Sequence, residues 1–304
     1  RRSLVDAPVG IDFLKRYAAD QDMIGEMWRP ETKPDNGMSI AIVGGGPAGL
    51  TAAYYLVLEG YRPVIYEALP HMGGMLRYGI PEYRLPKGTL DKEIDWIASL
   101  GVDIHTNKKL GKDFTIDDLF NEGYKAVFVG LGAQMGKPMR VENEEAEGVL
   151  SGVTFLQQVE MKTNPDIKGR VVVVGGGNTA IDAARTSLRL GAKEVILLYR
   201  RTRKEMPANE MEIVAADEEG VKMEFLAAPV KVNVEDGRMK SIDCIRMELG
   251  EPDESGRRRP VVIDGSESTL EADWILSAIG QEPDLDGVTQ DEKLQVTQRK
   301  TIIA

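Results

Sequence analysis

The residues best suited to chemistry begin with a glycine-rich stretch near residue 44. Gly44, Gly46 and Gly49 follow the apolar run at residues 39–43 and open a segment of small side chains. In such a stretch the first glycine permits a tight turn, the second lets the backbone approach a phosphate, and the third lets a helix pack closely on a strand. Free N–H groups and the helix dipole then favour an anion. The spacing predicts a pyrophosphate-binding turn formed by Gly44, Gly46, Pro47, Ala48, Gly49 and Leu50.

An acidic residue follows this turn at the distance that a ribose contact requires. Glu67 lies 67 − 44 = 23 residues after the first glycine, at the end of the next apolar run. A carboxylate at this place can accept hydrogen bonds from an unphosphorylated ribose, which favours FAD or NAD at the first turn. A glycine-rich turn that binds nothing is the alternative, and the order of strand, turn, helix and acid makes it the weaker one.

A second glycine-rich turn differs from the first in its charge. Gly175 and Gly177 follow an apolar run, with Ala180 in the place of the third glycine. Asn178 and Thr179 lie between Gly177 and Ala180. The next strand, 200 − 175 = 25 residues on, ends in Arg200-Arg201 rather than in an acid. Guanidinium groups can hold a 2′-phosphate, which a carboxylate would repel. The second turn, with Gly175, Gly177, Asn178, Thr179, Ala180, Arg200 and Arg201, therefore favours NADPH over NADH, although a solvated charge run is the alternative.

The repeated strand–turn–helix–strand pattern determines the expected fold. Each copy is a βαβ unit, so we expect an α/β chain with two Rossmann-like dinucleotide-binding domains. Residues 1–36 are amphipathic and are expected to form a helical segment and a linker. The first domain is expected at residues 37–150, resuming at about 281–304, and the second at 151–280. Alternating runs between residues 221 and 264 predict a small antiparallel sheet on the second domain.

Composition excludes several function classes. The net charge is −11, from 38 lysines and arginines against 49 acids, so no nucleic-acid partner is expected. The basic run Arg257–Arg259 lies among glycine, proline and acids, which predicts the solvated loop of a hairpin. No apolar run reaches the roughly 18 residues of a membrane span. Cys244 is the only cysteine, which is typical of a reducing compartment, and a cytoplasmic location is expected.

No side chain is expected to act as a nucleophile or to bind a metal. His71 and His105 are isolated, and Cys244 has no partner for the dithiol relay that thioredoxin reductases use. Hydride transfer between a nicotinamide and a flavin needs alignment rather than a protein nucleophile. The lack of an expected nucleophile, metal site or cysteine pair is therefore compatible with hydride transfer between the nucleotides that the two turns predict.

The stretch Gly73–Lys87, GGMLRYGIPEYRLPK, adds a family resemblance. With both turns it makes the chain similar to the glutamate synthase small-subunit family of FAD- and NAD(P)H-dependent oxidoreductases. That family is related to the flavin half of dihydropyrimidine dehydrogenase and to ferredoxin-linked NADPH oxidoreductases. The resemblance runs from Pro8 to Pro283 and implies FAD and NADPH as cofactors. It also implies further cofactor contacts, namely Gly74, Met75, Arg84, Leu110, Gly132, Ala278, Ile279 and Gly280.

The same resemblance implies how this chain would be used. Related subunits carry iron–sulfur cysteines upstream and a Gly-Asp segment near their carboxyl terminus, so this sequence is expected to be part of a longer polypeptide. Electrons from reduced FAD are expected to pass to iron–sulfur clusters outside this segment, in a larger catalytic or iron–sulfur subunit. A non-catalytic regulatory or scaffolding subunit is the alternative. A flavin monooxygenase or amine oxidase shares the first turn, but residues 78–87 and the arginine-ended second unit argue against it.

Overall fold

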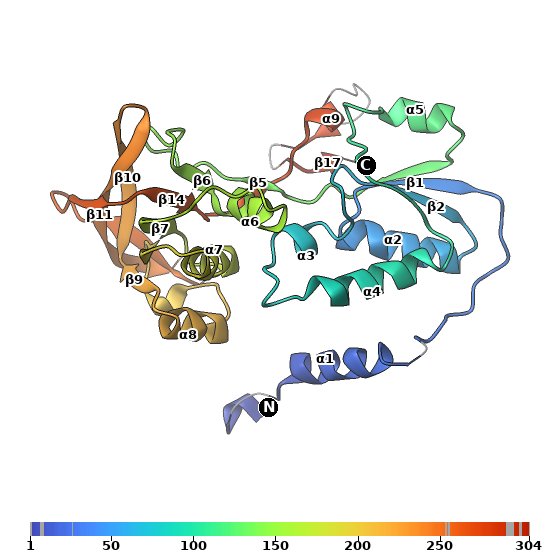
Figure 1. Ribbon diagram of the computed structural model, residues 1–304, viewed down its shortest axis with the longest axis horizontal. Coiled ribbons are helices and arrows are strands. Elements are labelled where there is room, and N and C mark those ends of the chain that lie inside the picture. The colour runs from blue at the N-terminus through green and yellow to red at the C-terminus, as the bar shows by residue number, and fades with distance from the viewer. Residues whose placement is uncertain are drawn as a thin grey trace.

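The structure, a computed structural model, describes residues 2–6, 9–25, 27–252, 254, 256–289, 295–297 and 300–303. Two α/β units make up most of the chain, and Figure 1 shows them side by side, joined near β5. Each unit has a parallel sheet whose strands lead into helices. This arrangement confirms the predicted α/β class with two Rossmann-like units.

The first unit is a four-stranded parallel sheet in the order β3-β2-β1-β4. β1 is a buried apolar run, whereas β2, β3 and β4 are partly exposed, and Gly44 and Gly49 allow α2 to pack closely against β1. The strands are β1 Ser39–Val43, β2 Arg62–Tyr66, β3 Asp103–His105 and β4 Ala126–Val129. The helices are α2 Pro47–Leu58, α3 Met75–Tyr78, α4 Lys87–Ala98 and α5 Ile116–Asn121.

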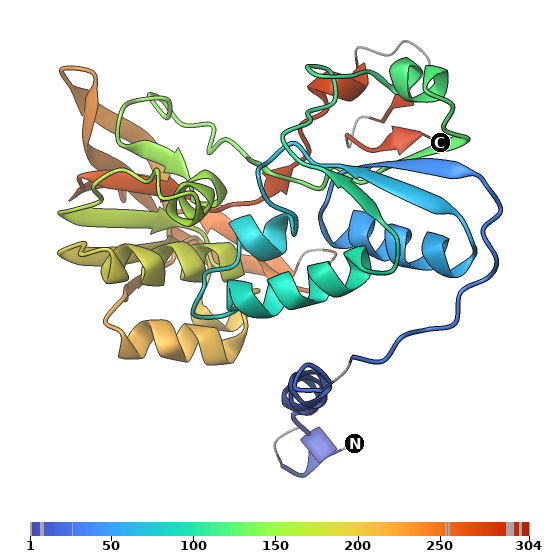
Figure 2. The same ribbon diagram turned by 45° about the vertical axis from the view of Figure 1, so that its right-hand side comes forward.

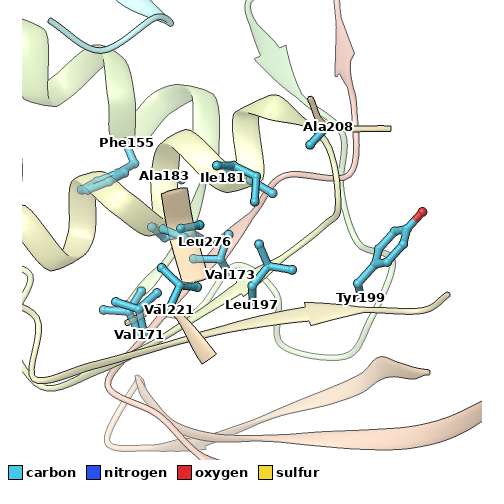
Figure 3. Close-up of a cluster of buried hydrophobic side chains, with 14 of the residues drawn as sticks. Phe155, Val171, Val173, Ile181, Ala183, Leu197, Tyr199, Ala208, Val221 and Leu276 are labelled. Atoms are coloured by element: carbon cyan, nitrogen blue, oxygen red, sulfur yellow. The ribbon is translucent and has the colours of Figure 1, made fainter. Parts of the chain in front are cut away.

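The second unit is a five-stranded parallel sheet in the order β6-β14-β7-β8-β9. Its strands are β6 Val149–Ser151, β7 Arg170–Val174, β8 Glu194–Tyr199, β9 Lys222–Phe225 and β14 Trp274–Ser277. Its helices are α6 Gly152–Glu160, α7 Asn178–Arg189, the short 3-10 helix η2 Arg203–Glu205 and α8 Glu210–Glu218. Figure 3 shows the core of this unit, where Phe155 and Ile181 from the helices meet Val173 and Leu197 from the sheet.

The second unit also has an antiparallel sheet, but one of the strands predicted for it belongs to the parallel sheet instead. The antiparallel sheet is formed by β10 Ala227–Glu235, β11 Arg238–Pro252, β12 Arg258–Val262 and β13 Ser268–Glu271. The run at residues 221–225 was expected in this sheet, and that prediction is wrong, because β9 pairs parallel with β8. Helix α8 separates the two strands, and a crossover through a helix returns the chain parallel to the strand that it left.

Two short strands carry the chain between the units. β5 Met135–Gly136 leads out of the first unit and pairs antiparallel with β15 Gln281–Glu282, which leads back. Because β6 already belongs to the second sheet, the crossover lies before residue 150. After β15, the helix α9 Asp286–Thr289 places Val288 against Ala41 and Val43 of the first unit. The hairpin of β16 Gln295–Val296 and β17 Ile302–Ile303 follows.

The amino-terminal segment contains a short helix followed by an extended stretch. A 3-10 turn, η1 Arg2–Leu4, precedes the helix α1 Ile11–Asp22, and residues 27–36 are extended. Pro30 and Pro34 lie in this extended stretch, where their missing N–H groups interrupt no helical hydrogen bond. No residue of α1 is buried, and both views show the helix away from the two sheets (Figures 1 and 2). In the described part of the chain, no helix is long and apolar enough to cross a membrane.

Glu219 connects α8 to α7 through two arginines. Arg185 Nη2 and Arg189 Nη2 lie 2.8 and 2.6 Å from its Oε1. The hydrogen bond from Arg189 contributes most to lowering the pKa of Glu219, to about 2, from an ordinary value of 4.5. Because the folded pKa is depressed, the stabilisation is complete above pH 4.5 and is lost as the pH falls toward 2.

We expect Glu219→Gln to lower the free energy of unfolding by about 1 kcal/mol at pH 7, a charge-assisted contact discounted for solvent. The deficit should shrink as the pH falls from 4.5 toward 2, where wild-type Glu219 becomes protonated. Urea unfolding at several pH values measures both effects. Glu218→Gln is the matched control, because that exposed neighbour makes no ion pair among the described residues. An equal loss in both variants, or a loss independent of pH, would contradict the role of Glu219.

Candidate functional site

The first glycine-rich turn connects β1 to α2 with no room for larger side chains. Gly44 has a φ of +108°, and an added Cβ would lie 2.3 Å from the carbonyl oxygen of Gly130. A Cβ on Gly49 would lie 1.9 Å from the carbonyl oxygen of Gly44. Pro47 begins the helix, while Leu50 is buried in the core of the first unit. The turn therefore brings the N-terminus of α2 directly onto the end of β1.

Glu67 supports this turn from the end of β2. Its side chain is 5% exposed, and its carboxylate accepts hydrogen bonds from the Gly45 N–H at 2.7 Å and the Leu69 N–H at 2.8 Å. Burial raises the pKa of Glu67, and the backbone N–H donors partly oppose this rise. Each carboxylate oxygen has a second lone pair, so Glu67 can accept a ribose hydroxyl as well. That ribose contact stays a prediction.

The stretch Gly73–Lys87 begins against the first turn. The Gly73 N–H donates to the Gly45 carbonyl at 2.8 Å, and a Cβ on Gly74 would lie 2.8 Å from the Cα of Gly46. Helix α3 starts at Met75, the next residue. Gly74 and Met75 are thus adjacent to the phosphate-binding turn that the sequence predicts.

Three other predicted contacts of the first site have different surroundings. Leu110 packs its side chain into the core beside Ala41 and Val43. Gly132 follows β4 on the way to β5, with open space where a Cβ would stand. Arg84 forms an ion pair with Asp182 of α7, in the other unit. The FAD contacts expected of Leu110, Gly132 and Arg84 stay predictions.

The second turn connects β7 to α7 in the same manner as the first. Gly175 has a φ of +146°, and a Cβ there would lie 2.4 Å from the carbonyl oxygen of Ala278. A Cβ on Gly176 would lie 2.6 Å from the ring of Tyr199, whereas Gly177 has only Pro207 near it, at 3.9 Å. Ala180 is fully buried, which fits its place at the helix–strand contact. The open side of this turn is therefore at Gly177.

A cavity of about 570 Å³ lies on that open side. The second turn, the end of β8, the end of β14 and the residues before β12 all contribute to its walls. Its lining includes Gly177, Thr179, Arg200, Arg201, Arg257 and Gly280. Ala278 and Ile279 also line it, so the structure brings most of the residues predicted for the second site to one cavity. Asn178 lies beside the cavity-lining turn, where its Oδ1 accepts a hydrogen bond from the Asn209 N–H at 3.0 Å.

Three arginines that line this cavity, Arg200, Arg201 and Arg257, give it a positively charged wall. Arg201 is 6% exposed, and its Nε donates to the Arg258 carbonyl at 2.7 Å, which fixes the start of β12 beside the end of β8. Arg257 lies in the connection of the β11–β12 hairpin, as the sequence predicts, but it also lines the cavity, which the prediction of a solvated loop did not include. Arg258 and Arg259 belong to β12. The three consecutive arginines were the only sequence signal for Arg257, and their neighbours resembled those of an ordinary loop.

Both turns fit the phosphates of a dinucleotide. The backbone N–H groups of Gly46 and Ala48 at the first turn donate to no acceptor within the described residues. The same holds for Asn178 and Thr179 at the second turn. Free N–H groups at a helix N-terminus provide what a pyrophosphate needs. No group of three or more potential metal-ligating side chains is found in the described ranges.

Two such turns on two Rossmann-like units define an oxidoreductase class with two dinucleotide sites. Residues 38–304 match the model of the pyridine nucleotide-disulphide oxidoreductase family, and the chain belongs to this family. The predicted oxidoreductase class is thereby confirmed.

Several similar proteins are named as subunits or small chains of NADPH- or NADP(+)-dependent enzymes. The chain is 47% identical over 310 residues to the NADPH-Fe(3+) oxidoreductase subunit beta of Geobacter sulfurreducens, covering 100% of this chain and 46% of that protein. It is 44% identical to the NADP(+)-dependent formate dehydrogenase subunit beta of Moorella thermoacetica, covering 99% of this chain and 46% of that protein. It is 37% identical to the glutamate synthase [NADPH] small chain of Escherichia coli, covering 90% and 61%. The resemblance to glutamate synthase small chains is confirmed, and the chain spans about half the length of the first two relatives.

Solved structures agree with the fold. Mycobacterium tuberculosis FprA in complex with NADPH is similar with a TM-score of 0.70 and 22% identity, over 82% of this chain and 71% of that one. Lactococcus lactis thioredoxin reductase is similar with a TM-score of 0.60 and 18% identity, over 90% and 85%. At these identities the likeness supports the fold of two dinucleotide-binding units.

We expect Gly49→Ala to lower the free energy of unfolding by about 3 kcal/mol, because its methyl group collides with the Gly44 carbonyl and separates α2 from β1. Gly88→Ala is the matched control, since a Cβ at this position in α4 meets nothing within 4 Å. The control should leave the free energy unchanged or raise it by up to about 1 kcal/mol. Urea unfolding measures both, and similar values for the two variants would contradict the close contact at Gly49.

Proposed function

We propose that this chain binds FAD at the first turn and NADPH at the second, and that hydride passes from NADPH to FAD. One observation carries the proposal: the two turns have the same backbone design but opposite charge at the end of the following strand. The buried carboxylate of Glu67 lies beside the first turn, and Arg200, Arg201 and Arg257 line the cavity at the second. A carboxylate suits an unphosphorylated ribose, and arginines suit a 2′-phosphate.

Each turn would hold its nucleotide by the same contacts. The open N–H groups at the start of α2 would receive the pyrophosphate of FAD, and those at the start of α7 that of NADPH. Gly74 and Met75 stand next to the first turn and would limit where the rest of FAD can extend. Arg201 is already oriented by the Arg258 carbonyl, so little side-chain freedom would be lost when a phosphate binds.

The chain between the units would bring the two nucleotides together. Ala278, Ile279 and Gly280 follow β14 and line the NADPH cavity just before the crossover strand β15. The Lys137 N–H donates to the Gly280 carbonyl at 3.0 Å, which fixes both crossover strands to each other. When bound, nicotinamide supplies a hydride that flavin accepts, and the contribution of the protein is proximity and exclusion of water.

Electrons would then leave through groups outside these residues. We propose iron–sulfur clusters of a partner domain or subunit as the acceptor, because relatives are named as subunits and this chain spans only 46% of two of them. The names of these relatives point to different final acceptors, so the final acceptor is not part of the proposal. The single cysteine, Cys244, is buried and fits a reducing compartment, which supports a cytoplasmic location.

We expect Arg200→Gln and Arg257→Gln each to weaken NADPH binding about tenfold, which corresponds to about 1.4 kcal/mol for a lost charge-assisted contact. NADH, which lacks the 2′-phosphate, should bind with nearly unchanged affinity. Titration of the full-length, FAD-loaded protein with both nucleotides gives the dissociation constants.

Lys193→Gln is the matched control, because Lys193 is an exposed cation just before β8, at the opposite end of the strand from Arg200. It should change neither affinity. Equal losses for NADPH and NADH in the arginine variants would show that these side chains do not recognise the 2′-phosphate.

A further inference from the structure

The segment Gly73–Lys87 connects the two nucleotide turns, and we refer to it as the strut. At its start, Gly74 lies so close to Gly46 that a Cβ would stand 2.8 Å from the Cα of Gly46. After α3, the strut continues as a loop that reaches toward the second unit in both views (Figures 1 and 2). The strut then enters α4 at Lys87.

Two buried cations fix the shape of the strut. Arg77 donates from Nε to the Met72 carbonyl at 2.6 Å and forms an ion pair with Asp91 of α4. Lys87 donates from Nζ to the carbonyls of Leu76 and Ile80, at 3.2 and 2.5 Å. Both residues are more than nine-tenths buried. Hydrogen bonds from these two side chains to backbone oxygens in and next to the strut therefore stabilise its shape.

The far end of the strut contacts the helix that begins at the second turn. Arg84 Nη1 lies 2.6 Å from Asp182 Oδ2, and Arg84 Nε lies 3.4 Å from Glu212 Oε1. The guanidinium groups of Arg185 and Arg189 lie 4.7 and 4.0 Å from the ring centre of Tyr83. Asp182 is the fifth residue of α7, two positions after the predicted NADPH-binding residue Ala180. The strut thus contacts the first turn at Gly46 and, at its far end, the helix α7 that follows the second turn.

The ion pair between Arg84 and Asp182 is costly to break. The Asp182 side chain is 5% exposed, and its Oδ1 has no hydrogen-bond partner among the described residues. Thr186, one helical turn further along α7, also has a buried hydroxyl without such a partner. Removing Arg84 would leave a buried carboxylate without its main cation, which is strongly unfavourable. Loss of this ion pair is therefore expected to change the position of the second unit relative to the first.

We propose that Arg84 is a positioning residue that sets the orientation of the NADPH-binding unit relative to the FAD-binding unit through its ion pair with Asp182. This inference rests on the proposed function, because it concerns the geometry of hydride transfer. Transfer requires the two reacting atoms to come within roughly 3–3.5 Å, and a misplacement of about 1 Å costs on the order of 100-fold in rate. The inference assigns Arg84 a role between the units instead of the direct FAD contact that the sequence predicts.

The test uses the full-length protein loaded with FAD, and anaerobic stopped-flow measurement of flavin reduction at saturating NADPH. Arg84→Gln and Asp182→Asn should each lower the rate constant by about tenfold or more, with FAD content and NADPH affinity within about twofold of wild type. The exchange of both residues, Arg84→Asp with Asp182→Arg, should recover part of the rate. Arg62→Gln is the control, because its exposed ion pair joins β2 to Asp35 of the amino-terminal segment and does not involve the second unit. It should leave the rate unchanged.

The pH dependence adds a readout that a merely structural role would not change. Burial, opposed by Arg84, raises the pKa of Asp182 to about 6, so the carboxylate is charged only above that pH. The charged or titratable groups that interact with it are Arg84, Glu212, Arg185, Tyr83 and Lys87. The wild-type rate should fall as the pH drops through about 6, whereas the rate of Asp182→Asn should lack this titration. A titration with the same midpoint in Asp182→Asn overturns the proposal.

A second readout does not depend on the proposed function. Spin labels on Glu93→Cys in the first unit and Glu235→Cys in the second report the distance between units. Cys244 will label poorly, since burial raises the pKa of its thiol to about 11. Arg84→Gln should broaden the distance distribution, and an unchanged distribution overturns the proposal.

The remaining outcomes separate the two hypotheses. Loss of FAD in Arg84→Gln, with the rate restored by excess FAD, would make Arg84 a FAD contact and overturn the positioning role. If NADPH does not reduce the wild-type flavin, the proposed function fails. In that case the distance distribution alone decides whether Arg84 holds the two units together.

Discussion

Close contact between a helix N-terminus and a strand end is the constraint on which the rest of the structure depends. In the first unit a Cβ on Gly49 of α2 would lie 1.9 Å from the carbonyl oxygen of Gly44, and in the second a Cβ on Gly175 would lie 3.3 Å from the Cβ of Ala180 in α7. This contact directs the first N–H groups of α2 and α7 toward the space in which a phosphate can bind. It also fixes where the next strand must end, and hence which side chain stands beside the ribose.

The two turns share this backbone design but differ in the charge beside them, which is the basis for assigning them different nucleotides. Glu67 is buried beneath the first turn and also holds its backbone, so its role in structure and its expected role in recognition are combined. The second turn has arginines from two distant parts of the chain, because Arg201 binds the Arg258 carbonyl and thereby brings the residues before β12 to the cavity. Under the proposed function the antiparallel sheet would thus contribute to nucleotide selection as well as to the core of the second unit.

The sequence predicts those features that depend on neighbours within about 30 residues. Strand, turn, helix and the charge after the next strand all lie within one βαβ unit, so both turns, Glu67 and Arg200 could be identified from spacing. The cavity role of Arg257 and the ion pair of Arg84 with Asp182 join residues that are distant in the sequence, and no local pattern encodes them. The parallel pairing of β9 was missed because a short apolar run does not show which sheet it joins.

The central claim is that hydride passes from NADPH to FAD within this pair of units. The most direct measurement is the anaerobic visible absorption spectrum of the full-length protein before and after addition of NADPH, with NADH added to a second sample. The account predicts a flavin band that NADPH bleaches at lower concentration than NADH does. A protein that stays colourless when FAD is supplied, or a flavin band that neither nucleotide bleaches, would contradict it and favour a subunit that binds nucleotides without turnover.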